Sequence, residues 1–249
     1  MVIIAFASQK GGTGKTTSAV NLSAIWAKKY KTLLVDCDPQ GNAKSGVGIK
    51  DYDSFTLADV LEGKCNAAEA IANTDFNLSI IPSNVSLSEL ERELNTNKLR
   101  SVLRPLETEF ELIVIDCPPS LGKLTASALV ACTDGVLIPF KPGQYGVEGL
   151  QQLMLNIVTV RRSGANPALK LLGIFYNEIN PRTNLLKVID SQIRPAYGQY
   201  ILQTVIRPAV KIAEAQVAGK PISAYNKHDS RDYIKLAKEV ENKWQTINS

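Results

Sequence analysis

Apolar runs alternate with amphipathic stretches along this chain, and together they predict alternating strands and helices. Seven runs rich in Val, Ile, Leu and aromatic residues are expected to form strands: 2–7, 32–35, 76–83, 111–115, 135–140, 171–176 and 201–206. Apolar residues recur at helical spacing in four intervening stretches: 15 to about 30, 86–106, 146–162 and 230–246. Continuous apolar strands are typical of a parallel sheet that is covered on both faces. The pattern therefore predicts an α/β fold with a doubly wound, mostly parallel sheet and helices on both faces.

The segment 43–75 has the least regular pattern. Short helices are expected at 57–61 and 67–72, and Ser86 is a plausible N-cap for the next helix because Glu89 follows three residues later. No linker, internal repeat or low-complexity tract interrupts the chain. With 249 residues and 45% hydrophobic content, it can bury a large core, so we expect residues 1–249 to form a single domain.

Composition favours a cytoplasmic protein. No apolar run approaches the roughly 20 residues of a membrane-spanning helix. The first predicted strand begins at the N-terminus, which leaves no room for a signal peptide. The four cysteines, Cys37, Cys65, Cys117 and Cys132, form no C-x-x-C pair, and His228 is the only histidine. We therefore expect reduced, buried thiols and no cysteine- or histidine-based metal or redox centre.

A glycine-rich turn joins the first predicted strand to the first helix. Its sequence is Gln9-Lys10-Gly11-Gly12-Thr13-Gly14-Lys15-Thr16-Thr17. Glycines let backbone N–H groups approach phosphate oxygens at a helix N-terminus, because no Cβ blocks the contact. Lys15 is expected to reach the β- and γ-phosphates, and the Thr16 hydroxyl to bind Mg²⁺. Residues Lys10 to Thr17 are thus the predicted phosphate-binding loop.

Three aspartates follow two other predicted strands. Asp36 and Asp38 come at the end of one apolar strand, and Asp116 ends another, before Cys117-Pro118-Pro119. Ligands of open α/β sheets bind at the carboxyl ends of the strands, so these carboxylates are expected near the glycine-rich loop. Carboxylates one residue apart cannot share a face of an extended strand, so the chain must already turn at Pro39. A solvated turn at the strand end is the alternative for Asp36 and Asp38.

The loop lacks the usual first glycine, which is replaced by Gln9, and carries a second lysine, Lys10. This Lys-Gly-Gly-x-Gly-Lys-Thr pattern resembles the deviant Walker A motif of the ParA/MinD group of ATPases. The Asp-x-Asp-Pro and Asp-x-Pro-Pro motifs and Tyr145-x-x-Glu148-Gly149-Leu150 follow the same family spelling. The resemblance implies ATP and Mg²⁺ as cofactors and a homodimer in the ATP-bound state.

The resemblance also implies roles for individual residues. Lys10 would contact the phosphates bound to the second subunit, and Asp38 would orient the attacking water. Lys10, Lys15 and Asp38 are therefore the predicted catalytic residues. The predicted metal-binding residues are Thr16, Asp36 and Asp116, with Asp116 holding Mg²⁺ through water.

Two later segments resemble the adenine-binding parts of that family. Asn177 follows the predicted strand 171–176 and is expected to contact adenine. Arg207-Pro208 resembles the segment that lines the base, although the family order is Pro-Arg. Both residues are therefore expected near the base, with their individual contacts left open.

Charge is distributed unevenly. Residues 1–160 contain 14 Lys/Arg and 17 Asp/Glu, a net −3, whereas residues 161–249 contain 14 and 7, a net +7. A folded basic face binds phosphate backbones without reading bases, and the alternative is an ordinary solvated surface. The resemblance favours nonspecific double-stranded DNA as a partner and a location on the nucleoid. Arg182, Lys187, Arg207 and Lys211 are the candidate DNA contacts.

These observations lead to one main hypothesis and two alternatives. The main hypothesis is a ParA-type ATPase that segregates or positions a plasmid, a chromosome region or a protein cargo, with slow hydrolysis stimulated by a ParB-like or adaptor protein. A MinD-type membrane-cycling regulator is disfavoured, because the helix 230–246 has the apolar face of a packed helix and Glu239 and Glu241 interrupt its basic residues. A metabolic P-loop enzyme, including a reductase with cluster-binding cysteines, is the other alternative.

Overall fold

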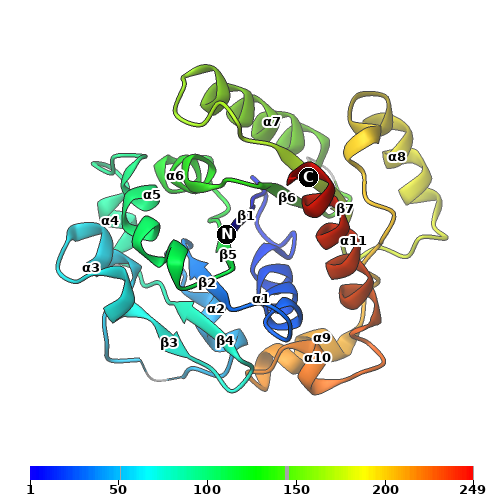
Figure 1. The fold of residues 1–249 in the computed structure, drawn as a ribbon. Helices are drawn as coiled ribbons and strands as arrows, with labels where there is room; N and C mark the ends of the chain where they lie inside the picture. The colour runs from blue at the N-terminus through cyan, green and yellow to red at the C-terminus, as the bar shows by residue number, and fades with distance from the viewer. Residues whose placement is uncertain (51, 144–145, 249) are drawn as a thin grey trace.

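A seven-stranded sheet forms the centre of the protein in a computed structural model, which describes residues 1–50, 52–143 and 146–248 (Figure 1). The strand order is β3-β4-β2-β5-β1-β6-β7, and all neighbours are parallel except β3 and β4. The strands are β1 (Val2–Phe6), β2 (Thr32–Asp36), β3 (Ala72–Asn73), β4 (Leu78–Ile81), β5 (Leu112–Asp116), β6 (Gly135–Phe140) and β7 (Leu171–Tyr176). This arrangement confirms the predicted doubly wound, mostly parallel sheet.

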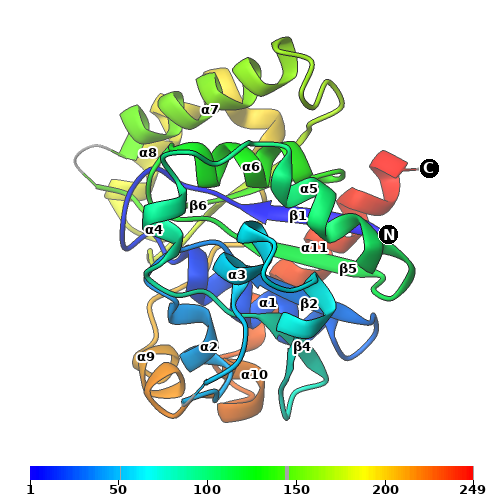
Figure 2. The ribbon, with the colours of Figure 1, turned by 90° about the vertical axis from the view of Figure 1, so that its left-hand side faces the viewer.

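Helices cover both faces of the sheet (Figure 2). The longer ones are α1 (Lys15–Trp26), α6 (Lys123–Ala131), α7 (Gly146–Arg162), α8 (Asn184–Tyr197), α9 (Val210–Val217) and α11 (Arg231–Asn248). The shorter ones are α2 (Asn42–Gly46), α3 (Leu57–Glu62), α4 (Leu87–Leu90), α5 (Lys98–Leu103) and α10 (Ile222–Tyr225). Three 3₁₀ turns complete the set: η1 (Ala67–Ala70), η2 (Arg104–Thr108) and η3 (Gly198–Tyr200).

The core is divided into two apolar layers by the sheet. In β1, Ile3 and Ala5 belong to the layer beneath α6 and α7, whereas Ile4 and Phe6 belong to the layer beneath α1 and α11. Successive side chains of a strand point to opposite faces, so a strand buried on both sides must be apolar at every position. This explains why the strands appear in the sequence as unbroken apolar runs.

Strand register brings the predicted site together at one edge of the sheet. Phe6 of β1 and Asp36 of β2 both pair with Asp116 of β5. The three carboxyl ends are therefore level with one another. The loop that follows β1 and the carboxylates of the two neighbouring strands meet at that edge.

The helix predicted over 86–106 is wrong. The structure has α4, a turn, α5 and η2 in its place. Between α4 and α5, the Asn95 side chain accepts a hydrogen bond from the Asn97 N–H. Asn side chains offer the backbone this local alternative to helical bonds, which explains the break. Ser86 is the N-cap residue of α4, as predicted, but its side chain makes no cap hydrogen bond.

The strand predicted over 201–206 is also wrong. Only two isolated parallel bridges form, Ile174 with Ile201 and Asn177 with Ile206. The N–H groups of Gln203 and Thr204 donate instead to the Glu239 carboxylate of α11. A side chain thus satisfies the donors that a neighbouring strand would otherwise use.

In the irregular segment, the short helix expected at 57–61 is confirmed as α3. The helix expected at 67–72 shortens to the 3₁₀ turn η1, after which residues 72–73 form β3. Tyr145, part of one family-like motif, lies outside the described residues.

The apolar face of α11 packs into the core. Tyr233, Leu236, Val240 and Trp244 are buried, and the Trp244 ring meets Trp26 of α1 edge-on at a centroid distance of 5.1 Å. The Trp26 indole N–H also donates to the Ala237 carbonyl. This packing confirms the interpretation of the helix as a core element. Within the described residues, no helix has both the length and the apolar character needed to cross a membrane.

Candidate nucleotide-binding site

The glycine-rich loop connects β1 to α1 at the carboxyl edge of the sheet. Gly12 and Gly14 adopt φ angles of 71° and 85°, a conformation that residues with a Cβ rarely take. Gly14 is the N-cap of α1 and supplies no capping side chain, so the first N–H groups of the helix are left for an anion. The positive end of the helix dipole lies at the same place. Loop and helix together form the anion-binding geometry that the sequence predicts.

Gly14 also packs against Asn177, the residue that directly follows β7. The Asn177 side chain is buried and its Nδ2 donates a 2.7 Å hydrogen bond to the Thr13 carbonyl. A Cβ at Gly14 would lie 2.2 Å from that nitrogen. The structure therefore places Asn177, which was expected to contact adenine, against the backbone of the phosphate loop.

Lys15 is positioned by the same loop. Its ammonium donates to the Lys10 carbonyl at 3.2 Å, and its side chain is only 6% exposed. Burial lowers the pKa of Lys15, while the carboxylates of Asp116 and Asp38 and the Cys117 thiol oppose this shift. The Lys10 carbonyl is a weaker partner than a phosphate, so Lys15 is held ready to exchange it for a phosphate oxygen.

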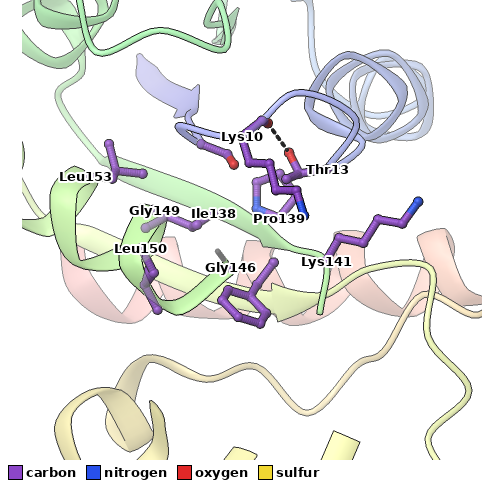
Figure 3. Close-up of a pocket in the computed structure, with 11 residues that line it drawn as sticks. Lys10, Thr13, Ile138, Pro139, Lys141, Gly146, Gly149, Leu150 and Leu153 are labelled. Atoms are coloured by element: carbon purple, nitrogen blue, oxygen red, sulfur yellow. Dashed lines mark hydrogen bonds between the residues drawn. The ribbon is translucent and has the colours of Figure 1, made fainter. Parts of the chain in front are cut away.

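The Lys10 side chain leaves the loop in a different direction. It lines a narrow cleft against the end of β6 and the start of α7, together with Phe140, Lys141 and Gly146 (Figure 3). Its ammonium lies beside Gly143, where a Cβ would be 3.0 Å away. Lys10 is not among the described residues that line the phosphate pocket of its own chain. Lys15 therefore lies at the phosphate pocket of its own chain, whereas Lys10 lies at the cleft next to α7.

The three aspartates are brought together but have different surroundings. Asp36 is fully buried, and its two oxygens accept hydrogen bonds from the N–H groups of Asp38 and Ala43. It thereby holds the turn after β2. Asp38 lines the phosphate pocket, and one of its oxygens accepts the N–H of Gln40. The turn expected at Pro39 is present, but Asp38 and not Asp36 is among the described residues that line the pocket.

Asp116 has two buried carboxylate oxygens without a hydrogen-bond partner. Burial raises the pKa of Asp116 to about 7, and the nearby Thr16 hydroxyl and Lys15 ammonium counteract the shift. An unpartnered buried carboxylate is costly unless a cation or donor completes it. Together with the Thr16 hydroxyl it supplies the hard oxygen donors that Mg²⁺ prefers.

No group of three or more His, Cys, Asp and Glu side chains suited to a metal exists among the described residues. Mg²⁺ is commonly held by one or two protein oxygens, substrate phosphates and water, so this sparse donor set fits it. Thr16 and Asp116 would hold the ion. Asp36 would act through the turn that it stabilises, since both of its oxygens already accept backbone hydrogen bonds.

The phosphate pocket has a volume of about 530 Å³. Its walls come from the loop, the turn after β2, α2, the segment after β5 and α9: Gly11, Gly12, Gly14, Lys15, Thr16, Thr17, Asp38, Gln40, Asn42, Ser45, Gly46, Pro119, Gln216 and Val217. Gln216 was not predicted as a site residue; its side chain donates to the Thr17 hydroxyl at 3.0 Å. No pattern signals a contact across 199 positions, so only the fold reveals it.

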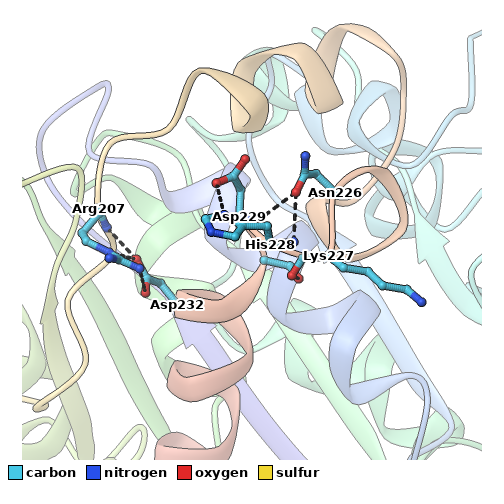
Figure 4. Close-up of polar contacts among 7 residues, drawn as sticks. Arg207, Asn226, Lys227, His228, Asp229 and Asp232 are labelled. Carbon is cyan, nitrogen blue, oxygen red and sulfur yellow. Dashed lines mark hydrogen bonds and ion pairs between the residues drawn. The ribbon is translucent and has the colours of Figure 1, made fainter.

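Arg207 and Pro208 have different environments despite being adjacent. The Arg207 guanidinium forms a two-bond ion pair with Asp232 at the start of α11, with N–O distances of 2.8 Å (Figure 4). Pro208 lines a second pocket next to the phosphate pocket. Among the other candidate DNA contacts, Lys211 pairs with Glu214, whereas Arg182 and Lys187 are exposed and form no ion pair with a described residue.

The chain is similar to known proteins over nearly its whole length. A family profile described as an AAA domain matches residues 1–171. The chain is 40% identical over 248 residues to the sporulation initiation inhibitor protein Soj of Bacillus subtilis, covering 96% of this chain and 97% of that protein. It is 39% identical over 249 residues to the chromosome-partitioning ATPase Soj of Treponema pallidum, covering 95% and 96%.

A solved structure extends the comparison to ligands. Cobyrinic acid a,c-diamide synthase from Mycobacterium smegmatis, with a bound ATP analogue and magnesium, superposes with a TM-score of 0.85 at 26% identity, covering 98% of this chain and 96% of that one. The neighbour thus holds an ATP analogue with magnesium, and the Treponema pallidum relative is an ATPase. The chain belongs to the ParA/Soj family of chromosome-partitioning ATPases.

Proposed function

We propose that this protein is a nucleotide-switched dimer that binds nonspecific DNA and segregates or positions a plasmid, a chromosome region or a protein cargo. The observation that carries the proposal is that the two lysines of the phosphate loop point to different surfaces. Lys15 lies at its own phosphate pocket, whereas Lys10 reaches away from it. A lysine directed away from its own pocket is available to a nucleotide on a second subunit.

In the proposed cycle, the N–H groups of residues 11–17 and the Lys15 ammonium bind the phosphates. Thr16 and Asp116 would hold Mg²⁺, which would neutralise phosphate charge. Asp38 orients the attacking water from the wall of the pocket, and Lys10 of the partner subunit adds positive charge as the terminal phosphate leaves. Hydrolysis separates the subunits, and a ParB-like or adaptor protein accelerates it.

DNA binding is assigned to the basic surface of the later part of the chain. Arg207 and Lys211 are paired with carboxylates, which reduces the charge they offer. Lys220, Lys227, Arg231 and Lys235 are exposed around α9, α10 and the start of α11, and none forms an ion pair with a described residue. Lys227 extends away from the neighbouring hydrogen-bonded turn (Figure 4). These four residues therefore join Arg182 and Lys187 as the proposed DNA contacts.

Fluorescence anisotropy with unrelated duplexes tests this assignment. With ATP, DNA binding should be indifferent to base sequence and should weaken steeply as salt is added. Each phosphate contacted should contribute roughly −0.9 to the slope of log affinity against log salt concentration. Lys227→Glu with Arg231→Glu should weaken DNA binding and leave ATP binding unchanged. Lys31→Glu, a reversal at the opposite edge of the sheet, is the matched control. Absence of DNA binding with ATP at low salt would refute the proposal.

A further inference from the structure

A second cavity lies directly beside the phosphate pocket. Its volume is about 310 Å³, and Thr17 and Gln216 line both spaces. These two side chains are hydrogen-bonded to each other. Because Thr17 belongs to the first turn of α1, a nucleotide whose phosphates lie on the loop can place its base in this cavity.

The cavity walls are mostly apolar. Pro208, Ala209, Val210, Ile212 and Ala213 form one side, and the Tyr233 ring lies on α11. Such walls suit the faces of a flat heteroaromatic ring but cannot distinguish one purine from another. Glu178 is the charged residue among those that line the cavity.

Glu178 is held there by an unusual backbone. Its φ angle is 53°, one of two positive values among the described residues other than glycine. The neighbouring N–H groups are fixed, with Asn177 donating to the Phe140 carbonyl and Ile179 to the Ile206 carbonyl. A non-glycine residue in this conformation is strained and is retained where the surrounding structure imposes it. The Glu178 side chain is thereby presented at a defined place on the cavity wall.

The Glu178 carboxylate keeps one oxygen for a ligand. Lys141, at the end of β6, forms an ion pair with Oε2. Oε1 accepts no hydrogen bond from the described residues. A carboxylate only accepts hydrogen bonds, and the ion pair limits the directions in which it can turn.

We propose that Glu178 selects adenine by accepting a hydrogen bond from the amino group at C6 of the purine. Hypoxanthine and guanine have a carbonyl at that position, so two acceptors would face each other. A site built to pair with a substrate donor rejects the analogue that lacks it, because the site group is then left unpaired. This assignment rests on the nucleotide site and does not depend on DNA binding or on the cargo.

Isothermal titration with ADP, IDP and purine riboside diphosphate in Mg²⁺ tests the assignment. These ligands carry an amino group, a carbonyl and a hydrogen at C6. The wild-type protein should bind ADP about 10- to 100-fold more tightly than IDP, with the purine riboside compound between them. Glu178→Gln should reduce the ADP-to-IDP ratio to within about threefold, because an amide can turn to present either an acceptor or a donor.

Glu109→Gln is the matched control, since Glu109 is an exposed glutamate paired with Lys31 at the opposite edge of the sheet. It should keep the wild-type ratio. Lys141→Met removes the ion pair and should keep the preference for ADP. A Glu178→Gln protein with the wild-type ratio, or a wild-type protein that binds ADP and IDP within threefold of each other, would overturn the assignment. Loss of all three ligands in the wild-type protein would instead contradict the nucleotide site itself.

Discussion

Substitution of Gly14 by alanine should separate two contributions to the stability of the phosphate loop. The first is backbone strain: at a φ of 85°, an L-residue costs about 1–2 kcal/mol. The second is the contact with Asn177, because the new Cβ would lie 2.2 Å from Nδ2 and must displace it. Loss of the bond to Thr13 in a buried setting costs about 1–3 kcal/mol. Gly14→Ala should therefore lower the free energy of unfolding by about 2–5 kcal/mol.

Gly63→Ala isolates the first contribution. Gly63 ends α3 with a φ of 83°, and a Cβ there would meet no atom within 4 Å. Its cost should be only the strain of about 1–2 kcal/mol. Urea unfolding of both variants without nucleotide measures the two losses in unfolding free energy. They can be compared directly if the dependence of that free energy on urea concentration is the same in both variants. Equal destabilisation of the two variants would refute the argument that Asn177 supports the loop.

Three further expectations concern the loop, the chemistry and the last helix. Lys15→Ala should abolish ATP binding. Lys10→Ala should still bind nucleotide but should remain a monomer in sedimentation experiments with a slowly hydrolysed ATP analogue. A Lys10→Ala protein that dimerises would contradict the role proposed for Lys10. Asp38→Ala should bind ATP but hydrolyse it about a hundredfold more slowly or worse in a phosphate-release assay, and an unchanged rate would assign the water to another residue. Trp244→Ala should cost about 3–5 kcal/mol in urea unfolding, because the ring is buried against Trp26; a neutral result would contradict the core role of α11.

Local pattern alone predicted the strands and helices that the core most strongly requires. Strands buried on both faces must be apolar throughout, so β1, β2, β5, β6 and β7 are visible in the sequence. The phosphate loop was also predictable, because its geometry depends on neighbouring residues and on glycines with positive φ. The carboxyl ends of parallel strands lie at one edge, which placed Asp36 and Asp116 together without a structure.

Errors arose where a side chain from elsewhere decided the local structure. Glu239 of α11 takes the backbone donors of residues 203–204, so an apolar run that resembles a strand forms only two bridges. Asn95 offers a local hydrogen bond that interrupts a helix whose apolar spacing looked continuous. Pattern analysis weighs apolar spacing and cannot register one competing hydrogen bond.

The sequence by itself determined the family, the fold class and the residues of the phosphate loop, because each depends on adjacent positions or on the alternation of strands and helices along the chain. Only the tertiary structure decided which surface or partner each of those residues contacts. It directed Lys10 away from the pocket, placed Asn177 under the loop and Glu178 in the second cavity, and paired Arg207 with Asp232. These relations join residues far apart in the chain, and their energies depend on distances that the order of residues does not encode.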